Sequence, residues 1–333
     1  MFFNLALIGF GNVNRALVQF LASKKSELKQ KYDLEYRVTG VMTRRLGWLA
    51  DPNGLDTNAL LEGKTVSSSI SSDIKAWLEE SEANLLFEAS SLDPFTGQPA
   101  IDYIRTALEH GAHVVTANKG PVVHAARELY ALAASRGLKF RHEASFMGGS
   151  PIYSLFRETL PGANIKRFRG LLNSTTSTIL QTIEAGSSFD EGVKRAQEIG
   201  IAETDPSFDV DGWDSAVKVC GLANVLLETQ LDVLKLERVS IRDLEVAEIQ
   251  DAARAGTPIR QVAFIDVLEN GLKAGVRHER IGMNDPLRAT GTTNISHFEL
   301  DVLPGLTITT HDAGAKETAY DMLADFINIA RVL

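Results

Sequence analysis

The sequence has little of several features that would place it in a specialised class of protein. Its 333 residues include a single cysteine, Cys220, which excludes a disulfide framework and a zinc site built from cysteine ligands. No apolar stretch approaches the ~18 uninterrupted residues of a membrane-spanning helix. Residues 1–12 are apolar, but no basic segment precedes them and glycines interrupt them. We therefore interpret them as a buried strand and not as a signal peptide.

Basic charge is also scarce, since 34 lysines and arginines stand against 43 aspartates and glutamates. Such a balance gives no broad electrostatic surface for nucleic acid. Hydrophobic residues make up 44% of the chain, which is enough for a sizeable core. We therefore expect a cytoplasmic protein of about two domains that acts on a small molecule, without a nucleic-acid or membrane partner.

The first part of the chain alternates short apolar runs with segments of helical periodicity. This alternation predicts an α/β fold, a doubly wound parallel sheet of Rossmann type, over residues 1–140. The expected strands are residues 2–8, 36–42, 85–87, 113–116 and 138–140, and the expected helices are residues 13–28, 101–109 and 122–135.

The pattern changes after about residue 150. Residues 165–172 and 259–283 are typical of strands in a second sheet, and residues 214–227 of a helix. Within residues 262–268 only Asp266 is polar, which predicts a strand covered on both faces. We expect residues 141–304 to form a second, α+β domain for substrate binding and dimerisation. Residues 305–333, with an amphipathic helix from about Glu317, should pack back on the first domain.

A glycine turn follows the first strand. Gly9, Phe10, Gly11, Asn12 and Val13 lie between this strand and the first helix, where glycines allow a pyrophosphate to approach the backbone. Asn14 stands where a third glycine is usual, so the helix and strand should pack differently. The alternative is an ordinary strand-to-helix turn, but the following βαβ pattern favours a dinucleotide site.

The second expected strand ends without the acidic residue that commonly binds the ribose of NAD. Arg44 and Arg45 follow it instead. A guanidinium suits a 2′-phosphate, so these residues favour NADP over NAD. A solvated basic loop is the alternative.

Carboxylates crowd the segment from Glu203 to Asp214. They are compatible with a solvated face, a calcium loop or a site for a cationic ligand, although the spacing does not fit an EF-hand. Asp214 and Lys218 are four residues apart on an expected helix and share one face. A lysine beside a carboxylate can pass a proton to a substrate, and the alternative is an ordinary exposed ion pair.

Four segments together resemble the homoserine dehydrogenase family. They are residues 116–119 (TANK), 143–152 (EASFMGGSPI), 173–180 (NSTTSTIL) and 202–218 (AETDPSFDVDGWDSAVK). The last of these fills every fixed position of the family signature. The tail from Gly314 is a degraded version of the family's glycine-rich turn.

The resemblance implies NAD(P)-dependent interconversion of L-homoserine and L-aspartate 4-semialdehyde, in threonine and methionine biosynthesis, by a homodimer. It implies sites that the residues above only outline. The catalytic residues would be Lys218, Lys119 and Asp214; the substrate residues Glu203, Asp209 and Thr175; and the further cofactor residues Ser90, Ser91, Lys119 and Gly314.

The resemblance further implies Na⁺, or a similar cation, held mainly by backbone oxygens of Glu143, Phe146, Gly148 and Ser150. The alternative is that Gly148 and Gly149 only form a tight turn.

Two other functions compete with this one: a different Rossmann-type dehydrogenase, and a non-enzymatic NAD(P) sensor. The acidic segment disfavours the first, and the presence of Lys119 and Lys218 disfavours the second. The chain stops at Leu333, directly after its last expected helix, so we expect no separate regulatory domain and no strong feedback inhibition by threonine through one.

Overall fold

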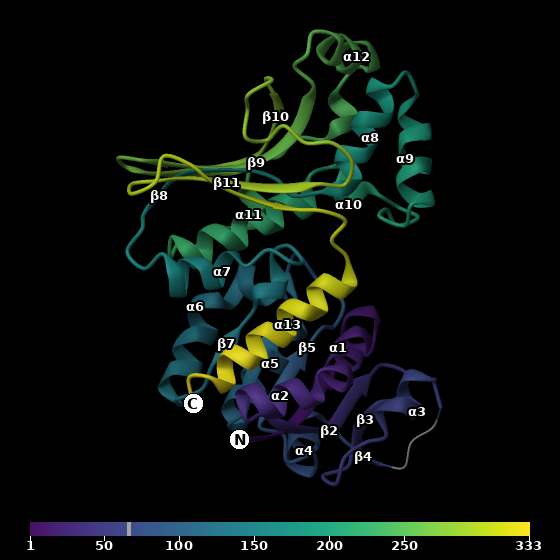
Figure 1. The fold of residues 1–333 in the computed structure, drawn as a ribbon, viewed down its shortest axis with the longest axis vertical. Coiled ribbons are helices and arrows are strands. Elements are labelled where there is room, and N and C mark those ends of the chain that lie inside the picture. The colour runs from purple at the N-terminus through teal and green to yellow at the C-terminus, as the bar shows by residue number, and fades with distance from the viewer. Residues whose placement is uncertain (65–67) are drawn as a thin grey trace. The chain divides into compact units, whose positions relative to one another are not determined.

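The structure, a computed structural model, describes residues 1–64 and 68–333, which divide into two compact units (Figure 1). Unit 1 contains Met1–Ser154 and Ala313–Leu333, and unit 2 contains Leu155–Asp312. The chain first passes from unit 1 to unit 2 after Ser154, beyond the expected residue 140, because the segment between these residues is hydrogen-bonded to α13 (Ala315–Ala330), the last helix. The backbone N–H of Glu143 donates to the Asp325 carboxylate, and that of Gly149 donates to the Asp321 carboxylate, each at a distance of 2.8 Å.

The sheet of unit 1 has the strand order β4-β3-β2-β1-β5-β6-β7. Its pairs β2-β1, β1-β5, β5-β6 and β6-β7 are parallel, which confirms the expected doubly wound fold, whereas β3 and β4 are antiparallel additions. The strands are β1 (Phe2–Ile8), β2 (Glu35–Thr43), β3 (Gly47–Ala50), β4 (Ser69–Ser71), β5 (Leu85–Glu88), β6 (His113–Thr116) and β7 (Phe140–Arg141).

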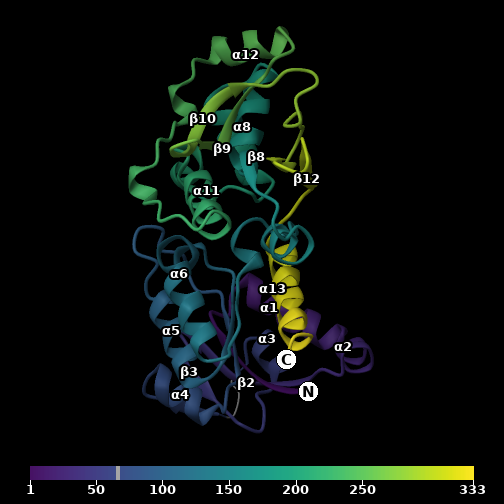
Figure 2. The ribbon, with the colours of Figure 1, turned by 90° about the vertical axis from the view of Figure 1, so that its left-hand side faces the viewer.

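Helices cover both faces of this sheet. Alternate residues of β1 point to opposite sides, so that Leu5 and Leu7 pack with α1 and α13, while Ala6 and Ile8 pack with α4, α5 and α6. Figure 2 shows α13 lying beside α1. The helices of unit 1 are α1 (Asn12–Ser23), α2 (Lys25–Tyr32), α3 (Thr57–Leu61), α4 (Ile74–Glu80), α5 (Ala100–His110), α6 (Lys119–Ser135), α7 (Ile152–Ser154) and α13 (Ala315–Ala330), with a 3-10 turn at Glu143–Ser145.

The helix expected at residues 13–28 is two helices. The chain turns at Lys24, whose N–H donates to the carbonyl of Phe20 and whose carbonyl accepts from Leu28. Leu28, the last apolar residue of the expected pattern, belongs to the second helix and is buried. The apolar periodicity of the sequence therefore continues from the first helix into the second and gives no sign of the turn at Lys24 between them.

Unit 2 has an antiparallel sheet of order β10-β9-β8-β11-β12. Helices α8 and α11 pack on it. The strands are β8 (Ile165–Leu171), β9 (Ile259–Leu268), β10 (Gly271–Arg280), β11 (Asn294–Leu300) and β12 (Leu306–Thr310). The helices are α8 (Ser174–Glu184), α9 (Phe189–Glu198), α10 (Ser207–Val210), α11 (Trp213–Leu226) and α12 (Val246–Arg254), with a π-helical segment at Leu155–Thr159 and 3-10 turns at Val233–Lys235 and Ile241–Asp243.

Strand β9 is covered over only part of its length, which corrects the expectation for residues 262–268. Val262 and Ile265 are fully buried, but Val267 and Leu268 are 41% and 49% exposed. Over residues 1–64 and 68–333, no helix has the length and apolarity to cross a membrane.

Candidate active site

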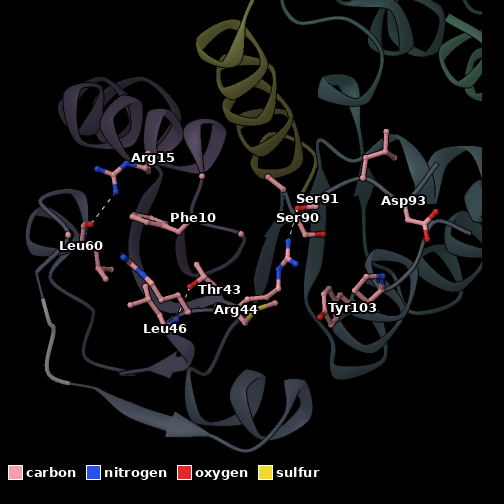
Figure 3. Close-up of a pocket in the computed structure, with 18 of the residues that line it drawn as sticks. Phe10, Arg15, Thr43, Arg44, Leu46, Leu60, Ser90, Ser91, Asp93 and Tyr103 are labelled. Carbon is pink, nitrogen blue, oxygen red and sulfur yellow. Dashed lines mark hydrogen bonds between the residues drawn. The ribbon is translucent and has the colours of Figure 1, made fainter. Parts of the chain in front are cut away.

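A cavity of about 640 Å³ opens in unit 1 at the carboxyl ends of β1, β2 and β5 (Figure 3). Ligands of doubly wound sheets bind at this edge. Seven residues expected at the cofactor site line the cavity: Gly9, Phe10, Gly11, Arg44, Arg45, Ser90 and Ser91.

The two glycines of the first turn have different structural reasons. Gly9 has a φ of 78°, and a Cβ there would lie 2.3 Å from the carbonyl oxygen of Ala89, so no larger residue fits. Gly11 caps α1, and a Cβ there would meet nothing within 4 Å. The open space beside Gly11 and the N–H groups of the helix N-terminus fit the pyrophosphate of a dinucleotide.

Asn14 stands where a third glycine is usual. A glycine there lets the helix approach the strand closely, whereas the Asn14 side chain forms hydrogen bonds to the end of the strand. This side chain is fully buried. The Nδ2 group donates to the carbonyls of Ile8 at 3.0 Å and Gly9 at 2.5 Å. The amide thus ties the first turn of α1 to the end of β1.

Cationic side chains outnumber carboxylates among the residues that line the cavity. Arg44 donates to the Ser91 hydroxyl at 3.3 Å, a contact drawn in Figure 3. Arg15 and Lys64 also line the cavity, and our sequence reasoning missed them because neither lies in a motif that it used. Among the described lining residues, four side chains are cationic, and the one carboxylate is that of Asp93. This balance favours a ligand with several negative charges.

Four other expected cofactor residues are not among the residues that line the cavity. Asn12 and Val13 begin α1, and Lys119 begins α6. Gly314 caps α13 and donates its N–H to Glu317 at 2.9 Å.

Unit 2 holds a separate cluster of charged side chains. The Nζ atom of Lys218 lies 2.7 Å from the carboxylate of Asp214, and the two side chains are only 13% and 10% exposed. Lys218 also donates to the carbonyl of Leu172 at 2.5 Å. The pair is therefore not the ordinary exposed ion pair that the helical spacing left open.

Asn173 connects this pair to a second carboxylate. Its Nδ2 group donates to Asp209 at 2.6 Å and to Asp214 at 3.0 Å. Its Oδ1 atom accepts from the N–H of Thr176 at 2.9 Å and caps α8. The sequence gives no signal for Asn173 beyond its place at the head of the segment 173–180. One amide thus holds two like charges close together.

The electrostatics of the cluster favour a cationic ligand. Burial raises the pKa of Asp209, and the nearby charge of Asp214 raises it further, while Asn173 and Lys218 oppose the shift. A ligand ammonium beside Asp209 would stabilise its ionised form and so offset the effects of burial and of the Asp214 charge. Thr175, also buried, donates its hydroxyl to the carbonyl of Ile201 at 3.0 Å.

The remaining acids of the crowded segment have other places. Glu203 is exposed in a loop whose backbone carbonyl accepts from Gln197 at 3.1 Å. Asp205 accepts from the N–H of Ser207 at 3.0 Å, and Asp211 from the hydroxyl of Ser240 at 2.7 Å. The segment is thus neither one solvated face nor one ligand shell.

The glycine-rich segment expected to bind a cation lies in unit 1. The carboxylate of Glu143 accepts the N–H groups of Tyr153 and Ser154, both at 2.7 Å, so this side chain organises the segment. Gly148 packs tightly, since a Cβ there would lie 2.9 Å from Thr318 Oγ1. The hydroxyl of Ser150 is buried without a partner. No group of three or more His, Cys, Asp or Glu side chains in the described part of the chain is arranged to hold a metal.

Two family models match this chain: homoserine dehydrogenase over residues 151–327, and the NAD-binding domain of homoserine dehydrogenase over residues 9–143. The chain belongs to the homoserine dehydrogenase family. It is 35% identical to an NAD⁺-dependent homoserine dehydrogenase of Pseudomonas canavaninivorans, over 98% of this chain and 96% of the relative. It is 33% identical to a homoserine dehydrogenase of Methanocaldococcus jannaschii, over 98% of both chains.

The fold agrees with this assignment. A hyperthermophilic archaeal homoserine dehydrogenase solved in complex with NADPH superposes with a TM-score of 0.84 at 27% identity, over 100% of this chain and 99% of that one. The activity of this chain is therefore the NAD(P)-dependent interconversion of L-homoserine and L-aspartate 4-semialdehyde, a step of amino-acid biosynthesis. The match decides against both competing functions, the other dehydrogenase and the non-enzymatic sensor.

Proposed function

We propose that Lys218 transfers the proton in the reaction of this homoserine dehydrogenase. Reduction of the aldehyde takes a hydride from the cofactor onto carbon and a proton onto the carbonyl oxygen, and the reverse reaction returns both. The observation that carries the proposal is the burial of the Lys218 ammonium against Asp214 and the Leu172 carbonyl. These partners hold a proton donor in one place, and a fixed donor is what general acid–base catalysis requires.

The neighbouring side chains divide the remaining tasks. Asp214 orients Lys218, and Asn173 keeps Asp214 and Asp209 in place. Asp209 would bind the substrate ammonium together with Glu203, and Thr175 would lie along the substrate. Lys119, the first residue of α6, would stabilise negative charge on the reacting oxygen.

Replacing Lys218 tests the proposal. We expect Lys218→Ala to lower kcat by roughly 10²–10⁴-fold, the scale of general acid–base catalysis. A matched control is Lys235→Ala, because Lys235 forms an ion pair with Asp232 in unit 2 but its side chain is 84% exposed. The control should keep its kcat. A normal kcat for Lys218→Ala would remove Lys218 from the mechanism and leave Lys119 as the candidate.

For the cofactor we propose NADP as the preferred form. Arg44 and Arg45 line the cavity of unit 1 and would bind the 2′-phosphate, with Arg15 and Lys64 adding positive charge. Asn12, Val13 and Gly314 would contribute backbone groups at helix N-termini. When bound, the nicotinamide supplies or accepts the hydride. Relatives carry both NAD⁺ and NADPH in their names, so the choice rests on these side chains.

The cation that the resemblance implies is a further part of the proposal. Glu143, Phe146, Gly148 and Ser150 would offer oxygens to Na⁺, and the unpartnered Ser150 hydroxyl fits such a ligand. The melting temperature should rise when NaCl replaces N-methylglucamine chloride at equal ionic strength. Identical melting curves would argue against the site.

We also propose a cytoplasmic homodimer that associates through the sheet of unit 2. The support is the exposure of Val267 and Leu268, which form an apolar end of β9 that a second copy would cover. Sedimentation at micromolar concentration should give a dimer, and a monomer alone would count against the proposal.

A further inference from the structure

Glu88 is a fully buried carboxylate that the mechanism above does not use. It ends β5 after Leu85, Leu86 and Phe87, all of which are also fully buried. Its Oε1 atom accepts the N–H of Ser90 at 2.8 Å and the hydroxyl of Ser90 at 2.5 Å. Burying a carboxylate costs free energy that an apolar residue at this strand end would not cost. The core therefore does not need Glu88, and its hydrogen bonds must serve something else.

The second oxygen of Glu88 extends the contact to the neighbouring strand. Oε2 accepts the hydroxyl of Thr116 at 2.6 Å, and Thr116 is the register partner of Glu88 on β6. The same hydroxyl oxygen accepts the N–H of Asn118 at 3.0 Å. The Thr116 hydroxyl thus links two hydrogen bonds, one from the Asn118 N–H and one to Glu88, so each holds the other in position.

The chain of contacts continues into α6. The side chain of Asn118 accepts the N–H of Gly120 at 3.0 Å and caps the helix. Lys119 lies between these two residues, so the network holds the backbone on both sides of it. Gly120 in turn meets the loop after β5, because a Cβ at Gly120 would lie 2.7 Å from the Cα atom of Gly97.

The loop after β5 is the wall of the cofactor cavity. Ser90 and Ser91 line the cavity, and their carbonyls lie 3.5 Å from the Nδ2 group of Asn118. The two loops that follow β5 and β6 are therefore joined by side-chain hydrogen bonds. The Glu88 carboxylate accepts from Ser90 in the first loop and from Thr116, the strand residue directly before the second.

We propose that Glu88 is a positioning residue for hydride transfer, because its carboxylate fixes the cavity wall at Ser90 and the start of α6 at Lys119 as one body. Glu88 touches neither substrate nor cofactor in this account; it acts through Ser90 and Thr116. The half of the inference that concerns Lys119 rests on the proposed role of that lysine, whereas the half that concerns cofactor binding does not.

Two variants test the inference. Glu88→Gln keeps the size and one acceptor oxygen but loses the acceptor for the Thr116 hydroxyl. Thr116→Val keeps the shape of the side chain and removes the hydroxyl. We expect each to raise the Kd for NADPH, measured by fluorescence titration, and to lower kcat, both by roughly ten-fold for a lost hydrogen bond to a charged group. The KM for aspartate semialdehyde should not change, because the proposed substrate residues Asp209 and Thr175 are not altered.

The control is Glu80→Gln. Glu80 accepts the hydroxyls of Ser69 at 2.9 Å and Ser71 at 2.7 Å in the same unit and does not line the cavity. This variant should keep its Kd and kcat. Variants of Glu88 and Thr116 that lose thermal stability but keep Kd and kcat would overturn the inference. If Glu88→Gln does not fold, Thr116→Val decides alone. Because the fluorescence titration needs no turnover, its result stands whether or not Lys218 transfers the proton.

Discussion

The cofactor cavity of unit 1 and the charged cluster of unit 2 are built in opposite ways. The cavity is wide, and its walls combine glycine backbone with cationic side chains around an opening of about 640 Å³. In the cluster, Lys218, Asp214, Asn173 and Asp209 are linked to one another by hydrogen bonds of 3.0 Å or less. Arg44 and Arg45 of the cavity can be replaced with consequences mainly for the ligand. A side chain of the cluster cannot be removed without leaving another polar group unsatisfied.

Asn173 should show the largest effect of this difference. Asn173→Ala removes the donor that bridges Asp209 and Asp214, and also the cap of α8. We expect kcat to fall by about 10²-fold and the unfolding free energy by about 1–3 kcal/mol. Asn173→Ser restores a capping hydroxyl but cannot bridge two carboxylates, so it should recover stability and not kcat. Equal recovery of both would mean that the amide acts only as a cap.

Arg44 and Arg45 test the other side of the comparison. Replacing both with alanine should weaken NADP binding by roughly 10–100-fold through the loss of charge-assisted contacts, and leave NAD nearly unchanged. Calorimetry with both cofactors measures this directly. Arg105→Ala is a suitable control, because Arg105 forms surface ion pairs with Asp102 and Glu128 in the same unit and does not line the cavity. Equal losses for NADP and NAD would show that the arginines only shape the fold.

Asp209 should impose a pH dependence on substrate binding. Burial and Asp214 raise its pKa, so the carboxyl holds its proton to a higher pH than an ordinary aspartate. The KM for homoserine should therefore fall as pH rises through this raised pKa, since only the ionised form attracts the ammonium. A KM profile for Asp209→Asn that keeps the same step would assign the titration to another group.

The same shift has a consequence for stability. The contribution of Asp209 is present below its ordinary pKa and is lost as pH rises through the raised pKa, because the folded state binds the proton more tightly. Asp209→Asn should therefore unfold at a higher denaturant concentration than the parent at neutral pH. A lower midpoint for the variant at neutral pH would contradict the direction of this shift.

Glu203 should give the smallest effect of the four. Its side chain is exposed and stands outside the linked cluster. Glu203→Ala should raise the KM for homoserine several-fold, within the ~1 kcal/mol of an exposed ion pair, and leave kcat unchanged. Steady-state kinetics in the oxidation direction measure both constants. A loss of kcat comparable to that of Asn173→Ala would place Glu203 inside the cluster after all.

The sequence predicted the parts of the molecule that depend on local pattern. The turn at Gly9 and Gly11 lies between strand and helix as expected, and α11 (Trp213–Leu226) begins and ends within one residue of the helix expected at 214–227. The short strands β3 and β4 escaped prediction because they add to an edge of the sheet and carry little apolar periodicity.

Contacts between distant residues could not be predicted in this way. Asn173 meets Asp209 and Asp214 across 36 and 41 positions of sequence. Thr116 meets Glu88 across 28 positions. A hydrogen bond of this kind depends on which strand ends and helix caps the fold brings together, and no spacing within one segment encodes it.

Titration of NADPH into folded Lys218→Ala enzyme tests most directly whether cofactor binding and proton transfer belong to different sites, the cavity of unit 1 and the charged cluster of unit 2. If unit 1 binds the cofactor and the cluster of unit 2 supplies the proton, the Kd should stay within about two-fold of the parent, because the residues that line the cavity all belong to unit 1 and Lys218 belongs to unit 2. A Kd weakened as strongly as kcat would contradict the claim and place Lys218 in the cofactor site.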